Sequence, residues 1–197
     1  EFIVPGLIMM TIITNSYANV VSTFYGAKFQ KNIEEMMVSP LWYSTMMMGF
    51  LSGGVIRGTL VGILVTCVSL FFAPIAFYNW GVMIVTCLLT SILFALGGML
   101  NAIFANKFDD IAIIPTFVLT PLTYLGGVFY SIHLLPELWQ KISLLNPILY
   151  LVNTFRYGFL GITDIPVDKA LLVLAILVVL MWVIVYSLIK KGVGLRA

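Results

Sequence analysis

The chain has 197 residues, of which 61% are hydrophobic and only 9% are charged, and its mean hydropathy is +1.10. An ordinary soluble domain is about half apolar and about a quarter charged, so this composition excludes a soluble domain and predicts a membrane protein. The net charge of +2 comes from basic residues scattered at the ends of apolar runs, which excludes a basic nucleic-acid-binding patch.

Five apolar stretches are each long enough to cross a bilayer core as a helix of about 20 residues. They are residues 2–24, 46–72, 81–104, 111–130 and 170–189. No internal repeat or long linker separates them, so we expect one all-α, polytopic transmembrane domain over residues 1–197.

The first stretch carries a stripe of polar side chains. The stripe consists of Thr11, Asn15, Asn19 and Ser22. Spacings of four, four and three residues place these side chains on one face of a helix. Two interpretations stay open: the stripe lines a translocation path, or its side chains bond to other packed helices, at about 0.6 kcal/mol each.

Residues 27–43 contain the longest polar interruption in the first half of the chain, QKNIEEMMVSP at positions 30–40. Asn32 is placed to cap a short helix with Glu34 and Glu35 in its first turn, where the helix dipole favours negative charge. Pro40, which follows Ser39, would end that helix. The segment is either a solvated turn or a rigid helix on which a moving partner docks.

The second stretch contains Arg57 near its middle, where a charged residue costs about 2.5 to 3.5 kcal/mol on insertion scales. Arg57 must therefore face protein or water. Gly54, Gly58 and Gly62 surround it at four-residue spacing, which lets another helix approach closely. Arg57 either bonds to a carbonyl or a polar group of another span, or takes a direct part in substrate passage.

The fourth stretch carries a second polar stripe, formed by Thr116, Thr120, Thr123 and Tyr124. Pro115 and Pro121 lie beside it, free backbone carbonyls and permit a kink, so this helix can flex or line a cavity. As in the first stretch, the hydroxyl groups either line a path or bond between packed helices.

Residues 131–166 are apolar in part, but His133, Glu137, Lys141 and Arg156 interrupt them too often for a clean crossing. We expect short extracytoplasmic helices there, lying on the membrane or partly re-entering it. The positive-inside rule sets the orientation. The cytoplasmic side then holds Lys28, Lys31, Lys107, Lys190, Lys191 and Arg196, against Lys141, Arg156 and Lys169 outside. Residue 1 would start outside, so we expect one further crossing before it, six in all.

The chain lacks the groups that power transport or catalysis. His133 has no second titratable residue beside it, and Cys67 and Cys87 have no metal-ligand spacing, so we expect an interfacial histidine, buried inert thiols and no metal site. No lysine is followed by Ser or Thr, as a phosphate-binding P-loop requires. Every acid lies outside the five stretches, so ion coupling has no carboxylate within the bilayer. Energy for transport would come from another polypeptide.

Two motifs resemble the ABC-2 type permeases, the membrane subunits of bacterial ATP-driven exporters. EEMMVSP at residues 34–40 resembles the segment after that family's second span. LLNPILYLVNTFRYGFLG at 144–161 is similar to its signature, with Asn146, Pro147, Arg156 and Gly161 as the matching residues. Residues 108–143 are also similar, and the resemblance is to permeases related to nodulation-factor and drug exporters. The family's cytoplasmic leader and first span have no counterpart here, so we expect a chain truncated at the N-terminus.

The resemblance implies a permease subunit of the bacterial inner membrane that is not itself an enzyme and holds no cofactor. It implies two copies of an ATPase partner that bind ATP and Mg, a second permease copy, and surrounding lipid. The implied contact with the ATPase is made by Asn32, Glu34, Glu35, Ser39 and Pro40. The first and fourth stretches would line the central chamber, for an amphipathic, drug-like or glycolipid substrate. A passive channel and a membrane scaffold without an ATPase are the alternatives.

Overall fold

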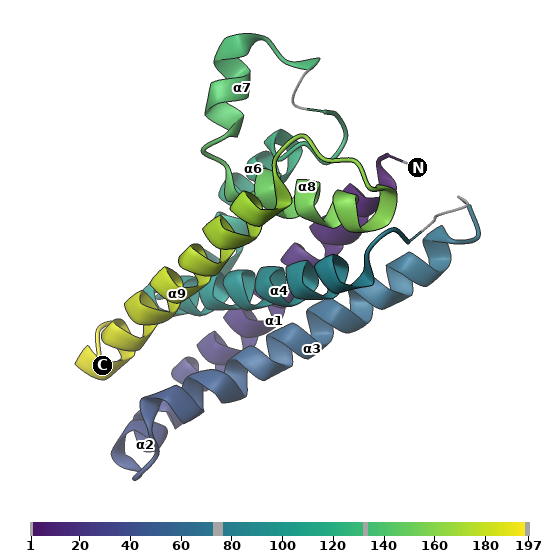
Figure 1. The fold of residues 1–197 in the computed structure, drawn as a ribbon. Helices are drawn as coiled ribbons and strands as arrows, with labels where there is room; N and C mark the ends of the chain where they lie inside the picture. Colours follow the sequence, from purple (N-terminus) through teal and green to yellow (C-terminus); the bar gives the residue numbers. More distant parts are fainter. Residues whose placement is uncertain (1, 73–76, 132–133, 196–197) are drawn as a thin grey trace.

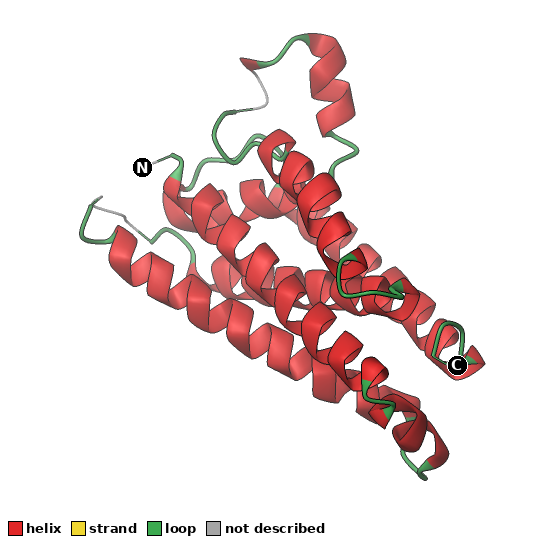
Figure 2. Cartoon of the chain, turned by 180° about the vertical axis from the view of Figure 1, so that it is seen from behind, coloured by secondary structure: helices red, strands yellow, loops and turns green. Residues whose placement is uncertain are grey.

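The computed structural model describes residues 2–72, 77–131 and 134–195, and the regular structure within these ranges is helical (Figures 1 and 2). The all-α prediction is confirmed. The helices are α1 (Val4–Phe29), α2 (Asn32–Val38), α3 (Tyr43–Ser69), α4 (Trp80–Phe104), α5 (Asp110–Ile114), the π-helix η1 (Pro115–Leu119), α6 (Thr120–Leu125), α7 (Glu137–Ser143), α8 (Pro147–Leu160) and α9 (Val167–Lys191).

Four of these helices, α1, α3, α4 and α9, are apolar and have 25 to 27 residues, which is enough to cross a membrane. They lie where four of the five crossings are predicted. The fifth predicted crossing, residues 111–130, holds the shorter helical run Asp110–Leu125, divided among α5, η1 and α6. Its status as a crossing stays a prediction.

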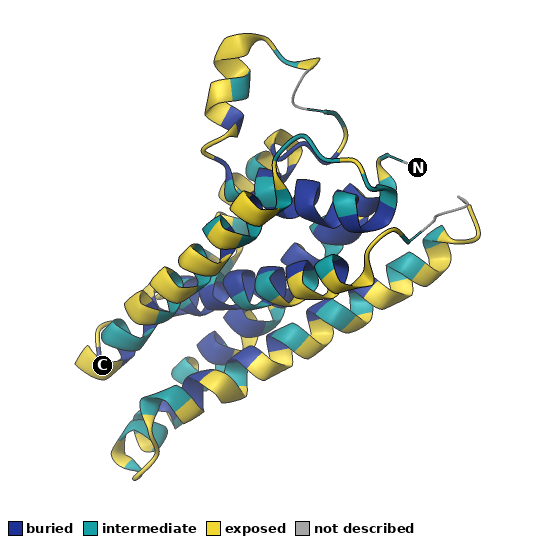
Figure 3. Cartoon of the chain, viewed as in Figure 1, coloured by how far each residue is buried: buried dark blue, intermediate teal, exposed yellow. Residues whose placement is uncertain are grey.

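Helices α1 and α4 form the centre of the molecule, while α3 and α9 lie at its sides and expose more of their surface (Figure 3). Glycines allow the central helices to approach closely. A Cβ atom on Gly98 of α4 would lie 2.6 Å from the Tyr17 carbonyl oxygen of α1. A Cβ atom on Gly58 of α3 would overlap the Ser16 hydroxyl of α1. The prediction that Gly54, Gly58 and Gly62 admit a neighbouring helix is confirmed.

One end of the bundle, which we call the α2 end, collects α2, the loop after α4 and residues 192–195 (Figure 1). Lys28, in the last turn of α1, donates hydrogen bonds to the carbonyl oxygens of Ile103 (2.8 Å) and Ala105 (2.7 Å) where α4 ends. Asp110 Oδ2 accepts bonds from the backbone N–H groups of Asn106 and Lys107, both at 2.9 Å, and these lower the Asp110 pKa. Segments that the charge pattern assigns to the cytoplasm thus share one end, although Arg196 lies outside the described residues.

The opposite end, which we call the α7 end, contains α6, α7 and α8 (Figure 1). Helices are present within 131–166 as expected, and α8 packs against α1, α4 and α9. Whether α7 and α8 re-enter the membrane stays a prediction.

Candidate functional site

The exposed side of α1 is polar along most of the helix. We call this the polar face of α1; it comprises Thr11, Thr14, Asn15, Ala18, Asn19, Ser22 and Thr23, all exposed or half-buried. Between Leu7 and Phe29, none of the large apolar side chains of α1 is exposed. The side helices differ, because Leu60 and Leu64 of α3 and many aliphatic residues of α9 are exposed. Lipid-facing helices are apolar, so the polar face of α1 fits water or another protein.

Hydrogen bonds of the polar face run along α1 itself. Thr11 Oγ1 donates to the Ile8 carbonyl oxygen (2.7 Å), Asn15 Nδ2 to that of Thr11 (2.9 Å), and Ser22 Oγ to that of Ala18 (2.7 Å). Bonds of this local kind satisfy a donor without tying the helix to a neighbour. Within the described residues, none of these three side chains forms a hydrogen bond to another helix, as the alternative interpretation would require.

The residues that flank the helical run α5–η1–α6 contact the two ends of α1. Phe108, just before α5, packs edge-on against Tyr25 with ring centroids 4.9 Å apart. Past α6, Val128 lies against Gly6, where an added Cβ would be 2.5 Å from the Val128 carbonyl oxygen. Figure 2 shows α1 and this run on the same side of the molecule. The two ends of the segment that carries the second predicted stripe are therefore held against the two ends of α1.

The second polar stripe is divided by the π-helix. Thr116, Thr120 and Tyr124 are exposed, but Thr123 is only 2% exposed and donates to the Thr120 carbonyl oxygen at 2.7 Å. Thr120 and Thr123 both lie in α6, three residues apart, so their side chains point about 60° apart around the helix, and the packing of α6 leaves Thr120 exposed and Thr123 buried. Thr123 thus faces the interior.

Helix α2 lies where the short charged helix is predicted, with Glu34 and Glu35 in its first turn. The prediction that Asn32 caps it is wrong: Lys31 is the N-cap, in the left-handed conformation (φ 62°), and Asn32 is the first helical residue. Its side-chain amide instead donates to Gln30 Oε1 at 3.2 Å. The tight turn from α1 places the start of α2 one residue earlier than the capping pattern indicates.

Helix α2 is anchored to the body of the molecule on one side and open on the other. Ile33 is 1% exposed and belongs to the apolar core, whereas Glu34 is half-buried and Glu35 is exposed. Ser39 donates to the Met36 carbonyl oxygen (2.7 Å), and the helix ends at Val38, before Pro40. Ile33 thus ties α2 to the apolar core, and α2 packs against α1.

The signature residues Asn146, Pro147, Arg156 and Gly161 begin, fix and end α8. Asn146 caps the helix by accepting from the Ile148 N–H (3.0 Å) and donates to the Leu122 carbonyl oxygen of α6 (2.7 Å). Pro147 follows in the first turn, where a proline needs no N–H partner, and Gly161 ends the helix at φ 71°. Their arrangement is that of a structural support rather than a pore lining.

Arg156 is 1% exposed and holds three segments of the α7 end together. Its Nη2 donates to the Gly127 carbonyl oxygen (2.7 Å), and its guanidinium carbon lies 3.8 Å from the centre of the Phe2 ring. Burial lowers the pKa of Arg156 to about 10, and the nearby Asp164 carboxylate opposes that shift. Asp164 in turn accepts bonds from Ser131 Oγ at 2.9 and 3.0 Å. The signature identified Arg156, but nothing in the sequence indicated Gly127 or Phe2 as its partners.

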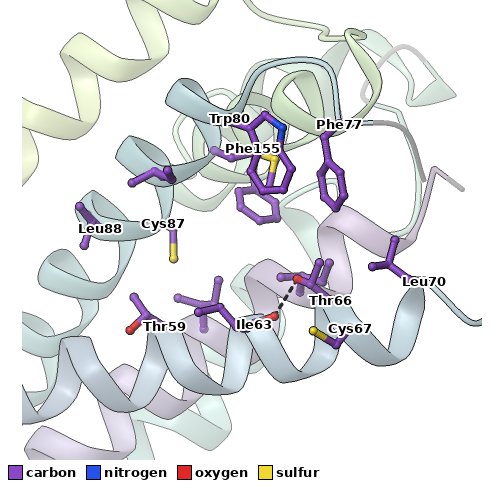
Figure 4. Close-up of a pocket in the computed structure, with 15 residues that line it drawn as sticks. Thr59, Ile63, Thr66, Cys67, Leu70, Phe77, Trp80, Cys87, Leu88 and Phe155 are labelled. Carbon is purple, nitrogen blue, oxygen red and sulfur yellow. Dashed lines mark hydrogen bonds between the residues drawn. The ribbon is translucent and has the colours of Figure 1, made fainter.

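An apolar groove of about 450 Å³ lies between α3, α4 and α1 in the half of the molecule nearer the α7 end (Figure 4). Its walls include Ile12, Ile63, Trp80 and Phe155, and no charged residue lines it. Cys67 and Cys87 also line this groove; both are free thiols, as expected, but Cys67 is exposed and Cys87 half-buried, so the prediction of two buried thiols is wrong. By helical register this groove and Arg57 lie on different sides of α3.

The described residues contain no cluster of His, Cys, Asp and Glu that could hold a metal ion, and His133 lies outside them. The described residues thus provide the polar face of α1, the acidic helix α2 anchored by Ile33, and the buried Arg156, which joins segments of the α7 end.

A helical membrane protein with these motifs is a transport permease, and the family comparison agrees: residues 1–160 match the ABC-2 type transporter family, to which the chain belongs. It is 56% identical to the inner membrane transport permease YadH of Escherichia coli (strain K12) over 197 residues, which cover 100% of this chain and 77% of YadH. It is 22% identical to Nodulation protein J of Neorhizobium galegae over 194 residues, which cover 96% of this chain and 73% of that protein. The chain is a multi-pass protein of the bacterial inner membrane.

Proposed function

We propose that this chain is the transmembrane subunit of an exporter that a separate ATPase drives, and that it moves an amphipathic, drug-like or glycolipid substrate. The observation that carries this proposal is the polar face of α1 on one of the two central helices. Seven neighbouring small residues without an exposed large apolar side chain are poorly suited to hydrocarbon. A hydrated path beside α1 accounts for their composition.

The path would be lined by the polar face of α1 and by Thr116, Thr120 and Tyr124 of the neighbouring run. That run would serve as the fifth crossing, with α7 and α8 partly re-entering the membrane from outside and all of residues 1–197 acting as one transmembrane domain. A second copy of the chain would close the other side of the path. Thr123 supports this wall from behind, because it is buried.

The drive would enter at α2. Two copies of the ATPase partner would bind ATP and Mg, close on each other, and push on Glu34 and Glu35, next to Asn32, Ser39 and Pro40. Because Ile33 anchors α2 to the core and α2 packs against α1, the push would move the first and fourth crossings and shift the chamber from inward-open to outward-open. Alternating access then needs no proton chemistry in this chain.

The test is the double substitution Glu34→Lys and Glu35→Lys in the full chain, together with a candidate ATPase subunit that contains a P-loop. Reversing two charges on the open side of α2 should leave membrane insertion intact, and reduce both ATPase co-purification and ATP-dependent export at least about ten-fold. Glu137→Lys is the matched control, because Glu137 is also a first-turn acid of a short helix, but at the α7 end. It should leave both measurements unchanged.

Normal ATP-dependent export by the double variant would contradict the coupling role of α2. Substrate flux through the reconstituted chain without any ATPase would instead indicate a passive channel. A chain that binds no ATPase and stimulates none with any candidate solute would indicate a scaffold.

A further inference from the structure

Arg57 is an exposed charge in the middle of a long apolar helix. It is the fifteenth of the 27 residues of α3, so about 20 Å of helix separates it from either end. Within the described residues no hydrogen bond or ion pair to its guanidinium is present. Hydrocarbon is a poor environment for this group, so something polar outside the described structure must meet it.

Arg57 belongs to the edge of α3 that adjoins the polar face of α1. Gly53, one turn earlier on the same edge, lies beside Asn19 of α1: a Cβ atom there would be 3.3 Å from Asn19 Oδ1. Because α1 and α3 run in opposite directions, one turn forward on α3 corresponds to one turn back on α1 (Figure 1). Arg57 therefore lies near the level of Asn15, beside the path proposed above.

The chain cannot supply the counter-charge at this level from its described residues. Their acids lie in loops or at helix ends: Glu34, Glu35, Asp109, Asp110, Glu137, Asp164 and Asp168. An identical second copy would bring the same acids to the same end positions. At the level of Arg57, the described residues of one copy, or of two identical copies, thus place no carboxylate.

We propose that Arg57, together with Asn15 and Asn19, binds the anionic group of an amphipathic substrate. This inference rests on the proposed function, and narrows its substrate class to amphiphiles that carry a phosphate, sulfate or carboxylate. A guanidinium matches such groups with two parallel N–H bonds, and the asparagine amides add neutral donors beside it. The exposed aliphatic side chains of Leu60 and Leu64 lie one and two turns further along α3, where the apolar part of the substrate would continue.

The test measures binding of dodecyl phosphate to the full chain in nanodiscs of phosphatidylcholine, with dodecyl maltoside as the neutral probe and inorganic phosphate as the headgroup alone. Arg57→Gln should weaken dodecyl phosphate binding about ten-fold or more and leave dodecyl maltoside binding unchanged. Arg57→Lys, which keeps the charge, should retain part of the affinity. Lys190→Gln, at the α2 end of α9, is the matched loss of a cation and should have no effect.

Equal binding of dodecyl phosphate by the wild-type chain and Arg57→Gln would overturn the site. Equally tight binding of inorganic phosphate would indicate a free-anion site, and loss of the difference in phosphatidylglycerol nanodiscs would indicate a resident lipid headgroup; each would overturn the substrate assignment. If Arg57→Gln unfolds, the comparison of Arg57→Lys with wild type decides. Because this binding assay requires no ATPase, its result is independent of the Glu34 and Glu35 test.

Discussion

Arg156 is a residue on which the packing of the α7 end depends. Substituting Gln removes the charge-assisted bond to the Gly127 carbonyl and the contact with the Phe2 ring. We expect Arg156→Gln to lower the free energy of unfolding by about 2 to 3 kcal/mol, since bonds to charged groups contribute about 1.5 to 3 kcal/mol and the cation–π contact adds to this. Equilibrium unfolding in detergent measures it.

The matched control for Arg156 is Lys141→Gln, because Lys141 is an exposed cation on α7 at the same end of the molecule. Its stability should equal that of the wild-type chain. Arg156→Lys should recover only part of the loss, because an ammonium group lacks the planar fork of a guanidinium. If Arg156→Gln were as stable as the wild-type chain, the contacts of Arg156 with Gly127 and Phe2 would contribute nothing to the free energy of unfolding.

The two arginines show what could be predicted at this scale. The span pattern identified Arg57 as a charge within a crossing, and the resemblance identified Arg156, but neither indicated which was buried. Gly127 lies 29 positions before Arg156, so their contact is decided by how the helices pack rather than by local sequence. At Asn32 the local sequence pattern gave a wrong prediction, because Lys31 adopts the left-handed conformation and is itself the N-cap of α2.

Among the helices, the contact of α3 with α1 depends on its glycines and provides the next prediction. Gly58→Leu places a side chain where the Ser16 hydroxyl lies, so the helices must separate. Gly49→Leu is the matched control on the same helix, because a Cβ atom at Gly49 meets nothing within 4 Å. Replacing glycine by leucine favours the helix by about 1 kcal/mol at either position. The difference between the two variants in the free energy of unfolding therefore reports the packing of α3 against α1.

We expect Gly58→Leu to lower the free energy of unfolding by about 1 to 3 kcal/mol or more, and Gly49→Leu to leave it unchanged or slightly higher. Thermal unfolding of the two variants in the same detergent compares them directly. Equal melting temperatures would mean that the α1–α3 contact can relax to admit a leucine.

The long apolar helices could be predicted well, because the thickness of the bilayer sets their minimum length. The bilayer requires about 20 apolar residues per crossing, and α1, α3, α4 and α9 meet that requirement. It was harder to predict which residues share a face in the run from Asp110 to Leu125, because the π-helix between Pro115 and Leu119 changes the number of residues per turn. Thr123 is buried although it shares α6 with the exposed Thr120, so the packing of α6, and not the spacing of the threonines, decides which of them faces the interior.

One side of the molecule is polar and another is apolar. Which helix faces form each side could not be predicted from the sequence, because this depends on how the helices pack. The polar face of α1 and the run α5–η1–α6 share one side (Figure 2), while the apolar groove with Cys67 opens between α3 and α4 (Figure 4). A membrane domain with a hydrated path on one side and hydrocarbon on the other has this asymmetry. Water should therefore reach the middle of α1 but not the groove.

Thiol labelling tests this asymmetry, because a maleimide reacts with the thiolate, which forms in water and is suppressed in apolar surroundings. Ala18 is exposed near the middle of α1, in the polar face, and Cys67 is exposed in the groove. In proteoliposomes with a sulfonated maleimide on both sides, Ala18→Cys in a Cys67→Ser, Cys87→Ser background should react at least about ten-fold faster than Cys67 in a Cys87→Ser chain. Equal rates would mean that α1 faces hydrocarbon as the groove does, and the hydrated path beside α1 would have to be abandoned.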